Sequence, residues 1–288
     1  MRTILAIFSF TLISINLSAQ HKYAYAIFDT EGNKTSYYVM AEKANKQDVI
    51  LFGEIHNNPV CHWLQYELTK DVHSKTGNNL TLGAEMFEAD NQLILNEYLQ
   101  EHIPERSFES EAKLWNNYET DYKPIVEYAR ENRLSFIATN IPRRYAAMVN
   151  RGGFEALDNL SEKALKYIAP LPVKYDPQLP GYKKMLEMTE MPGHMSKNLP
   201  KAQAIKDATM AHFIYKNLQD ETVFLHFHGT YHSNNYEGIV WYLNKLDEKL
   251  QIMTISTVEQ SAVETLDSEN HGLADFIIVV TETMTKTY

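Results

Sequence analysis

The sequence is poor in cysteine, in positive charge and in long apolar runs. Its single cysteine, Cys61, excludes an internal disulfide, so a hydrophobic core of ordinary size must hold the chain together. Lys and Arg number 27 against 37 Asp and Glu, which gives a formal net charge of −10. This charge argues against a nucleic-acid or anionic-membrane surface, because both select for clustered Lys and Arg. We interpret Cys61 as a small packed side chain rather than as a nucleophile.

The one extended apolar run lies at the N-terminus. Arg2, the apolar residues 4–15 and the small residues Ser18 and Ala19 have the order that is typical of a secretory signal peptide. The apolar part is short for a membrane span, although an uncleaved anchor is the alternative. We therefore expect a signal peptide over residues 1–20 and an exported protein, periplasmic or associated with the cell surface. No cysteine stands at the end of the signal, where a lipid anchor would be attached.

The remaining residues, 21–288, are predicted to form a single α/β domain. Short apolar runs bounded by turn residues predict buried strands, and helical spacing separates most of them, as in a parallel sheet with helices on both faces. The predicted strands are 48–52, 80–82, 134–138, 222–227, 251–256 and 275–281, and the predicted helices include 58–77, 93–99, 125–129 and 205–218. The stretch 152–201 holds six of the ten prolines and four methionines, and it is predicted to be a helical insert or lid before the fourth strand.

Polar side chains follow the first four of these strands. In a parallel sheet the carboxyl ends of the strands meet at one edge, where ligands usually bind, so we expect these side chains to converge. They are Glu54, His56, Glu85, Asn140, Arg143, Arg144, His228 and His232. Taken singly, each also has a structural interpretation, such as a helix cap for His56. No metal site is predicted, because the familiar His-Glu-x-x-His zinc motif is absent.

Five motifs in a fixed order resemble those of the ChaN-like haem-binding uptake proteins. The broader grouping also includes TIKI-type proteases, TraB-type proteins and erythromycin esterases. The resemblance runs from about residue 48 to 246 and rests on FGEIH (52–56), GAEMFE (83–88), ATNIPRR (138–144), AQAIKDATMA (202–211) and GTYH (229–232). It implies an α/β fold whose site contains His56, Glu85 and His232, with Glu54 inside the first motif.

The resemblance implies haem as the ligand and a role in haem or iron uptake or storage. In that case Arg143 and Arg144 would provide the positive charges that bind the haem propionates. The iron ligand stays open among Tyr145, Tyr175, Tyr182 and His194, and an outer-membrane haem receptor and a homodimer are candidate partnerships. The rival hypothesis is a hydrolase, esterase-like or metallopeptidase-like, that uses His56 and His232, with Glu85 as a base or a metal ligand and Glu54 beside them.

Overall fold

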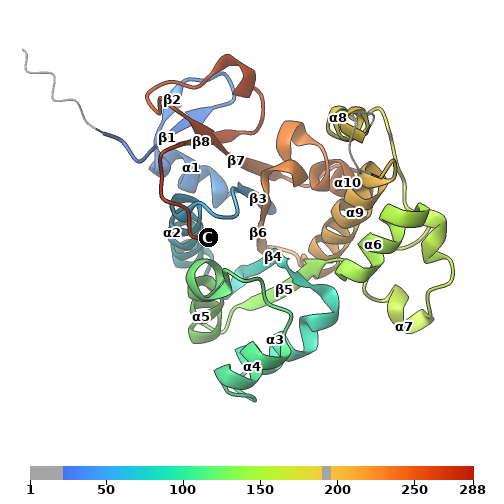
Figure 1. Ribbon diagram of the computed structural model, residues 1–288. Coiled ribbons are helices and arrows are strands. Elements are labelled where there is room, and N and C mark those ends of the chain that lie inside the picture. Colours follow the sequence, from blue (N-terminus) through green and yellow to red (C-terminus); the bar gives the residue numbers. More distant parts are fainter. Residues whose placement is uncertain (1–21, 190–195) are drawn as a thin grey trace, which may run out of the picture.

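One eight-stranded sheet forms the centre of the protein in a computed structural model, which describes residues 22–189 and 196–288 (Figure 1). The strands follow the order β2-β1-β8-β7-β3-β6-β4-β5 across the sheet. They are β1 (Tyr25–Asp29), β2 (Lys34–Thr35), β3 (Val49–Glu54), β4 (Leu80–Glu88), β5 (Ser135–Asn140), β6 (Val223–Gly229), β7 (Ile252–Gln260) and β8 (Phe276–Thr281). All neighbours from β8 to β5 pair in parallel, and β1 pairs antiparallel with both β2 and β8.

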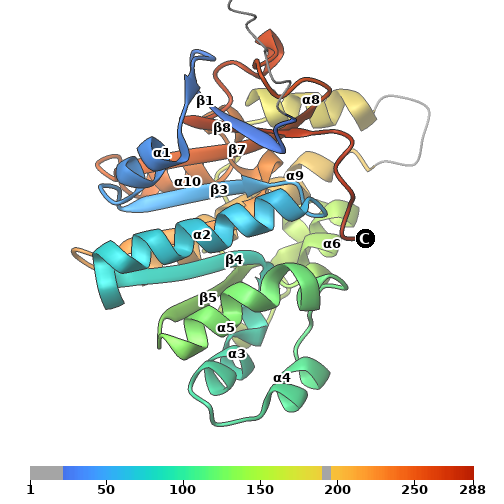
Figure 2. The same ribbon diagram turned by 90° about the vertical axis from the view of Figure 1, so that its left-hand side faces the viewer.

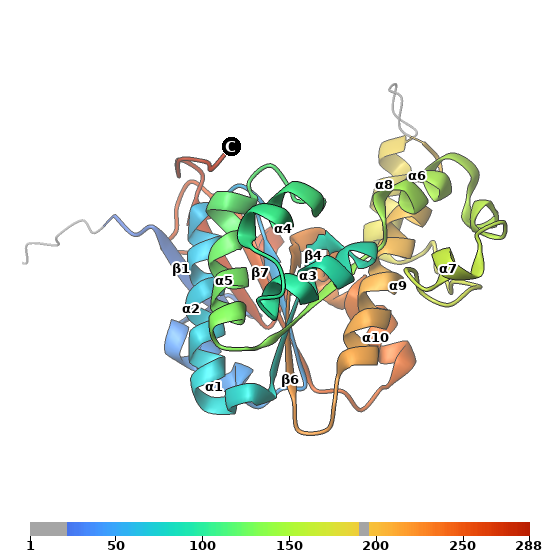
Figure 3. The same ribbon diagram turned by 90° about the horizontal axis from the view of Figure 1, so that it is seen from below.

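Helices cover both faces of this sheet (Figures 2 and 3). The α-helices are α1 (Tyr37–Ala44), α2 (Pro59–Thr76), α3 (Gln92–Leu99), α4 (Glu105–Glu111), α5 (Lys123–Glu131), α6 (Arg143–Gly152), α7 (Glu162–Leu165), α8 (Pro180–Thr189), α9 (Leu199–Asn217) and α10 (Ile239–Leu246). Helices α1, α2 and α5 share one apolar cluster with the sheet, and α9 and α10 share another on the opposite face. The predicted α/β architecture is therefore confirmed.

Strands β3 and β6, which lead to His56 and His232, lie inside the sheet because most of their side chains are apolar on both faces. Every residue of β3 and of β6 is buried, as a strand with helices on both sides requires. Helix α2 begins where the sequence predicts it: the Asn58 side chain accepts a hydrogen bond from the Val60 amide, and Pro59 occupies the first turn. The short strands β1 and β2 and the helices α1 and α10 were not predicted.

Strand β4 differs from the prediction in a way that shapes the site. The sequence places the strand end at Leu82, but the strand continues to Glu88 with a bulge against β5 between Ala84 and Glu88. Polar residues in the motif obscured this extension, because they do not look like a buried strand. A bulge re-aims side chains, and here Glu85 within it points to the carboxyl end of β6.

The described part of the predicted insert is helical and packs on α6 and α9. It contains a 3-10 turn (Phe154–Leu157), α7 and α8, and its apolar side chains share a cluster with α6 and with the beginning of α9. The predicted signal peptide and His194 lie outside the described residues. Within residues 22–189 and 196–288, no helix has the length and apolar character needed to cross a membrane.

Candidate functional site

His56 lies just beyond the end of β3, with its ring held by the last residue of that strand. Its Nδ1 is 2.9 Å from Glu54 Oε1, and Glu54 also accepts hydrogen bonds from the Tyr122 hydroxyl (2.7 Å) and the Gln65 amide (2.5 Å). Burial alone would raise the pKa of Glu54, but His56, His62 and Gln65 outweigh it and lower the pKa. Burial would lower the pKa of His56, but the carboxylates of Glu54 and Glu85 outweigh burial and raise it. Because Nδ1 donates to Glu54, the lone pair of the neutral form of the ring is on Nε2.

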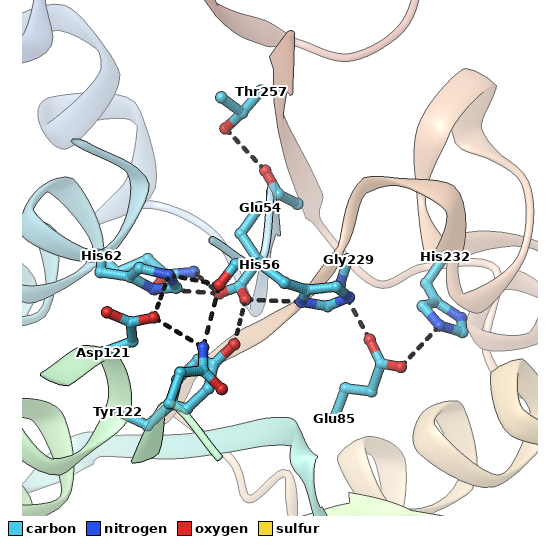
Figure 4. A network of polar contacts seen from close by, with 12 residues as sticks. Glu54, His56, His62, Glu85, Asp121, Tyr122, Gly229, His232 and Thr257 are labelled. Atoms are coloured by element: carbon cyan, nitrogen blue, oxygen red, sulfur yellow. Dashed lines mark hydrogen bonds and ion pairs between the residues drawn. The ribbon is translucent and has the colours of Figure 1, made fainter. Parts of the chain in front are cut away.

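His62, in the first turn of α2, contacts both His56 and Gln65 and helps to hold them in place. Its Nε2 faces the carbonyl oxygen of His56 (3.0 Å), and its Nδ1 faces the side-chain oxygen of Gln65 (3.2 Å). The Gln65 nitrogen already donates to Glu54, so it is the Gln65 oxygen that faces His62. His62 is buried and lies between Glu54 (3.7 Å) and Asp121 (3.5 Å). Figure 4 shows this group.

His232 is the centre of a second charged group, at the carboxyl end of β6. Its Nε2 lies 3.1 Å from Glu85 Oε1, and its Nδ1 contacts Asp207 on α9. Burial acts to lower the pKa of His232, but the carboxylates of Glu85 and Asp207 outweigh burial and raise it to about 9. The Tyr182 hydroxyl of α8 donates to the other oxygen of Asp207 (2.6 Å). His232 is thus a buried imidazolium between two carboxylates.

Gly229 separates these two groups and lets them approach each other. Its amide donates to Glu85 Oε2 (2.9 Å), and a Cβ at this position would lie 2.8 Å from His56 Nε2. Burial would raise the pKa of Glu85, but His232 holds it well below its usual range. His56, Glu85 and His232 are therefore brought together, as Figure 4 shows, with Nε2 of His56 facing the Glu85 carboxylate across Gly229.

A pocket of about 640 Å³ opens onto this cluster. Its floor carries His56, which is about one-third exposed, and Glu85. The remaining lining comes from β4, the segment before α5, the end of β5, the helices α6 and α9, and the C-terminal segment. These residues are Glu88, Lys113, Leu114, Trp115, Asn116, Asn117, Asn140, Ile141, Arg143, Lys206 and Tyr288. Trp115 packs edge-on against the His56 ring at 5.0 Å between centroids.

The other residues selected from the sequence are distributed unevenly around this pocket. Asn140 and Arg143 line it, whereas Arg144 pairs with Asp90 (2.6 Å) and donates to the Tyr145 hydroxyl. Tyr145 is buried against α9 and does not line the pocket. The rings of Tyr175 and Tyr182 pack against each other, 5.6 Å apart, and do not line it either.

His228, another selected residue, points into the protein interior. The hydroxyl of Thr139 donates to the carbonyl of Ala84 and therefore accepts from His226 Nε2. His226 Nδ1 must then accept from His228 Nδ1, which leaves His228 Nε2 to accept from the Ser233 hydroxyl. Burial lowers the pKa of His228 to about 3, so the ring is neutral. With both nitrogens in use and no exposed surface, His228 has no free atom for a ligand.

Sequence reasoning missed three residues that complete the site: His62, Asp207 and Lys206. Asp207 and Lys206 stand inside the AQAIKDATMA motif, whose charged pair on an otherwise apolar helix was a usable signal. His62 gave no such signal, because its partners Glu54 and Asp121 are separated from it in the sequence.

Residues 40–243 match the model of a protein family described as haem-binding uptake, Tiki superfamily, ChaN. The chain belongs to this family. No curated protein matches the sequence. The structure of ChaN of Campylobacter jejuni, described as showing cofacial haem binding, is similar over 89% of this chain and 97% of its own, with 17% identity and a TM-score of 0.68. That similarity shows a shared fold.

Two other solved structures are less similar. A Bacillus cereus protein is 12% identical over 86% of this chain and 92% of its own, with a TM-score of 0.47. An erythromycin esterase in its open conformation is 12% identical over 90% of this chain and 83% of its own, also with a TM-score of 0.47.

Proposed function

We propose that this chain is an exported haem-binding protein that acts in haem or iron uptake or storage. The observation that carries the proposal is membership of the ChaN family of haem-binding uptake proteins, over more than two-thirds of the chain. The functional unit is the chain from residue 21 onward, with 152–201 as its helical insert. Its partners are haem itself and an outer-membrane haem receptor, and two copies form a homodimer.

The pocket above His56 has the side chains that haem requires. Leu114, Trp115 and Ile141 provide an apolar wall, and Arg143 and Lys206 provide positive charge. Asn140 adds a buried side-chain oxygen, Oδ1, that accepts no hydrogen bond from the described part of the chain. An apolar wall beside cations suits a flat macrocycle with two propionates.

Two of the side chains that line the pocket carry atoms that ligate haem iron in proteins, His56 and Tyr288. The Nδ1 of His56 is bonded to a carboxylate, as is usual for metal-ligating histidines. Tyr145 and Tyr182, by contrast, already use their hydroxyl groups inside the protein. We therefore expect the axial ligand of the haem iron to be His56 or Tyr288.

Titration with haemin tests the proposal. The mature chain, from about His21, should shift the Soret band and saturate at a fixed stoichiometry. A Tyr ligand should give a ferric high-spin spectrum, whereas paired His ligands should give a low-spin one. N-terminal sequencing of the protein from the periplasm or medium should begin at Gln20 or His21. An unshifted Soret band would refute haem binding, and an intact Met1 in the membrane fraction would refute cleavage.

A hydrolase is the second candidate, favoured by the contact between Glu54 and His56. A histidine with Nδ1 on a carboxylate and a free Nε2 is arranged as a general base, and the imidazolium of His232 beside Glu85 could donate a proton. This candidate would be favoured if the protein causes no Soret shift of haemin but turns over ester or peptide substrates, and if that turnover disappears in His56→Ala. Haemin binding without turnover would exclude it.

A further inference from the structure

Most charged side chains that border the pocket are matched by opposite charges. Glu85 is paired with His232, and Lys113 lies 3.1 Å from Glu88 and 3.3 Å from Asp90. Arg143 is different. No carboxylate lies within ion-pair distance of it anywhere in residues 22–189 and 196–288. In a chain of net charge −10, an exposed arginine without a carboxylate at a pocket is informative.

Lys206 faces the same pocket from α9 and is also without an ion pair among the described residues. Its charge acts on the neighbouring Glu85, where it helps to lower the pKa of that carboxyl. Since Glu85 already bonds His232 and the Gly229 amide, the ammonium group of Lys206 is available to a second anion. Two cations from different helices thus border one space.

The N-terminus of α6 borders this space too. The residue before the helix is Pro142, and no side chain caps the first turn. Within the described residues, the amides of Arg143 and Arg144 have no acceptor, as expected for the first two residues of an uncapped helix. A cation at a helix N-terminus opposes the helix dipole, and an anion bound there would remove this conflict.

Asn140 provides an independent sign of a ligand. Its residue is 7% exposed, its nitrogen donates to the Glu85 carbonyl (2.9 Å), and its Oδ1 has no partner among the described residues although it lines the pocket. A buried amide oxygen is rarely left without a donor. A water that donates one hydrogen to Asn140 and the other to a bound carboxylate would satisfy both.

We propose that Arg143, Lys206 and the first amides of α6 form a carboxylate-binding subsite, and that it holds a haem propionate. The inference rests on the proposed haem function and deepens it. The macrocycle would pack against Trp115 and Leu114, which line the same pocket as His56. Lys206, which the sequence did not indicate, replaces Arg144, because Arg144 is already bound to Asp90.

The test compares haemin with its dimethyl ester, in which both carboxylates are blocked, in the same dilute detergent. Wild type should bind the ester at least roughly tenfold more weakly, since each lost charge-assisted hydrogen bond is worth about that factor. Arg143→Ala and Lys206→Met should each weaken haemin binding by a similar factor and leave ester binding nearly unchanged. Arg144→Ala, next to Arg143 but bound to Asp90, is the matched control and should affect neither ligand.

The outcomes distinguish the subsite from the haem function on which it rests. Haemin that binds with a Soret shift, but no more tightly than its ester, overturns the subsite and leaves the haem function standing. The subsite is also overturned if Arg144→Ala weakens haemin binding as much as Arg143→Ala does. Absence of any haemin binding to the wild type overturns the haem function itself. Circular dichroism of each variant distinguishes a lost contact from a lost fold.

Discussion

His232 is charged inside the protein because two carboxylates surround it, and this makes the stability of the protein depend on pH. Its pKa is about 9 in the folded state, above the value of about 6.5 expected in the unfolded chain. The stabilisation is therefore fully present below pH 6.5 and is lost as the pH rises through 9. This difference between the two pKa values contributes on the order of 3 kcal/mol to the free energy of unfolding.

Urea unfolding at pH 6, 7.5 and 9 should reveal this dependence. His232→Gln should lower stability at pH 6 by a few kcal/mol, since it leaves two buried carboxylates without their partner. It should also flatten the decline between pH 6.5 and 9. His102→Gln, at an exposed position, should keep the wild-type profile. Equal slopes for wild type and His232→Gln would contradict the assignment.

Position 238 requires glycine because its Cα packs against the backbone of His232. Its φ is +53°, and a Cβ there would lie 2.3 Å from the carbonyl oxygen of His232. Gly77 has a similar φ of +57° with nothing within 4 Å of the added Cβ. Alanine should therefore cost about 1 kcal/mol at Gly77, from the backbone alone, and clearly more at Gly238. Thermal unfolding of both variants measures the difference, and equal losses would refute the packing argument.

At the scale of elements, β5 forms one edge of the sheet and is closed by a side chain. The Gln92 amide on α3 donates to the Phe136 carbonyl (2.9 Å) and accepts from the Ala138 amide (2.6 Å), so it replaces a neighbouring strand. Edge strands with free backbone groups are templates for aggregation.

Gln92→Ala should expose these two backbone groups and increase aggregation on mild heating. Light scattering at a temperature below unfolding measures the rate. Gln100→Ala changes an exposed glutamine directly after the C-terminal end of the same helix; it is the control and should behave as wild type. An unchanged rate for Gln92→Ala would mean that α3 itself, and not its amide, protects the edge.

The sequence predicted elements well where the local pattern and the tertiary environment agree. The strands at residues 49–54 and 223–229 are buried on both faces, so a plain apolar run identified them. The extension of β4 through Glu85 escaped, because a bulge and a buried charge pair have no local signature. The π-helical turn Tyr118–Tyr122 escaped for the same reason, although it supplies the Tyr122 hydroxyl to Glu54.

For the site, the sequence indicated which residues gather but not which partners they take. The convergence of His56 and His232 follows from their places after parallel strands, and Glu85 joins them from the bulged end of β4. That His228 turns inward, and that Arg144 is used by Asp90, depends on side-chain directions and on distant carboxylates. Those are set by packing, which no spacing in the sequence records.

At the scale of the whole molecule, β1 closes a small core of its own. The apolar side chains of β1 share a cluster with β8 and with the loop before it, in which Phe28, Ile277 and Val279 are buried. The family match begins only at residue 40, so this closure lies outside the matched part. Removing β1 would uncover that apolar surface and leave β8 as a second open edge.

A chain that begins at residue 36 should therefore aggregate or unfold cooperatively at a lower temperature than one that begins at Tyr23. Burial of apolar side chains worth about 1.5–3 kcal/mol each gives the expected direction and a loss of several kcal/mol. Size-exclusion chromatography and thermal unfolding of both chains check it. A monomeric, equally stable shorter chain would show that the sheet does not need β1.

The pairing of β1 with β8 also sets an order in time. Among the described residues, the first strand hydrogen-bonds to the last one, from Tyr25 opposite Val280 to Asp29 opposite Phe276. The sheet therefore cannot be finished until almost the whole chain has been made, and such distant contacts form slowly. One edge of the sheet therefore stays unpaired until the last strand is made, and the apolar side chains of β1 have no partner strand before that moment.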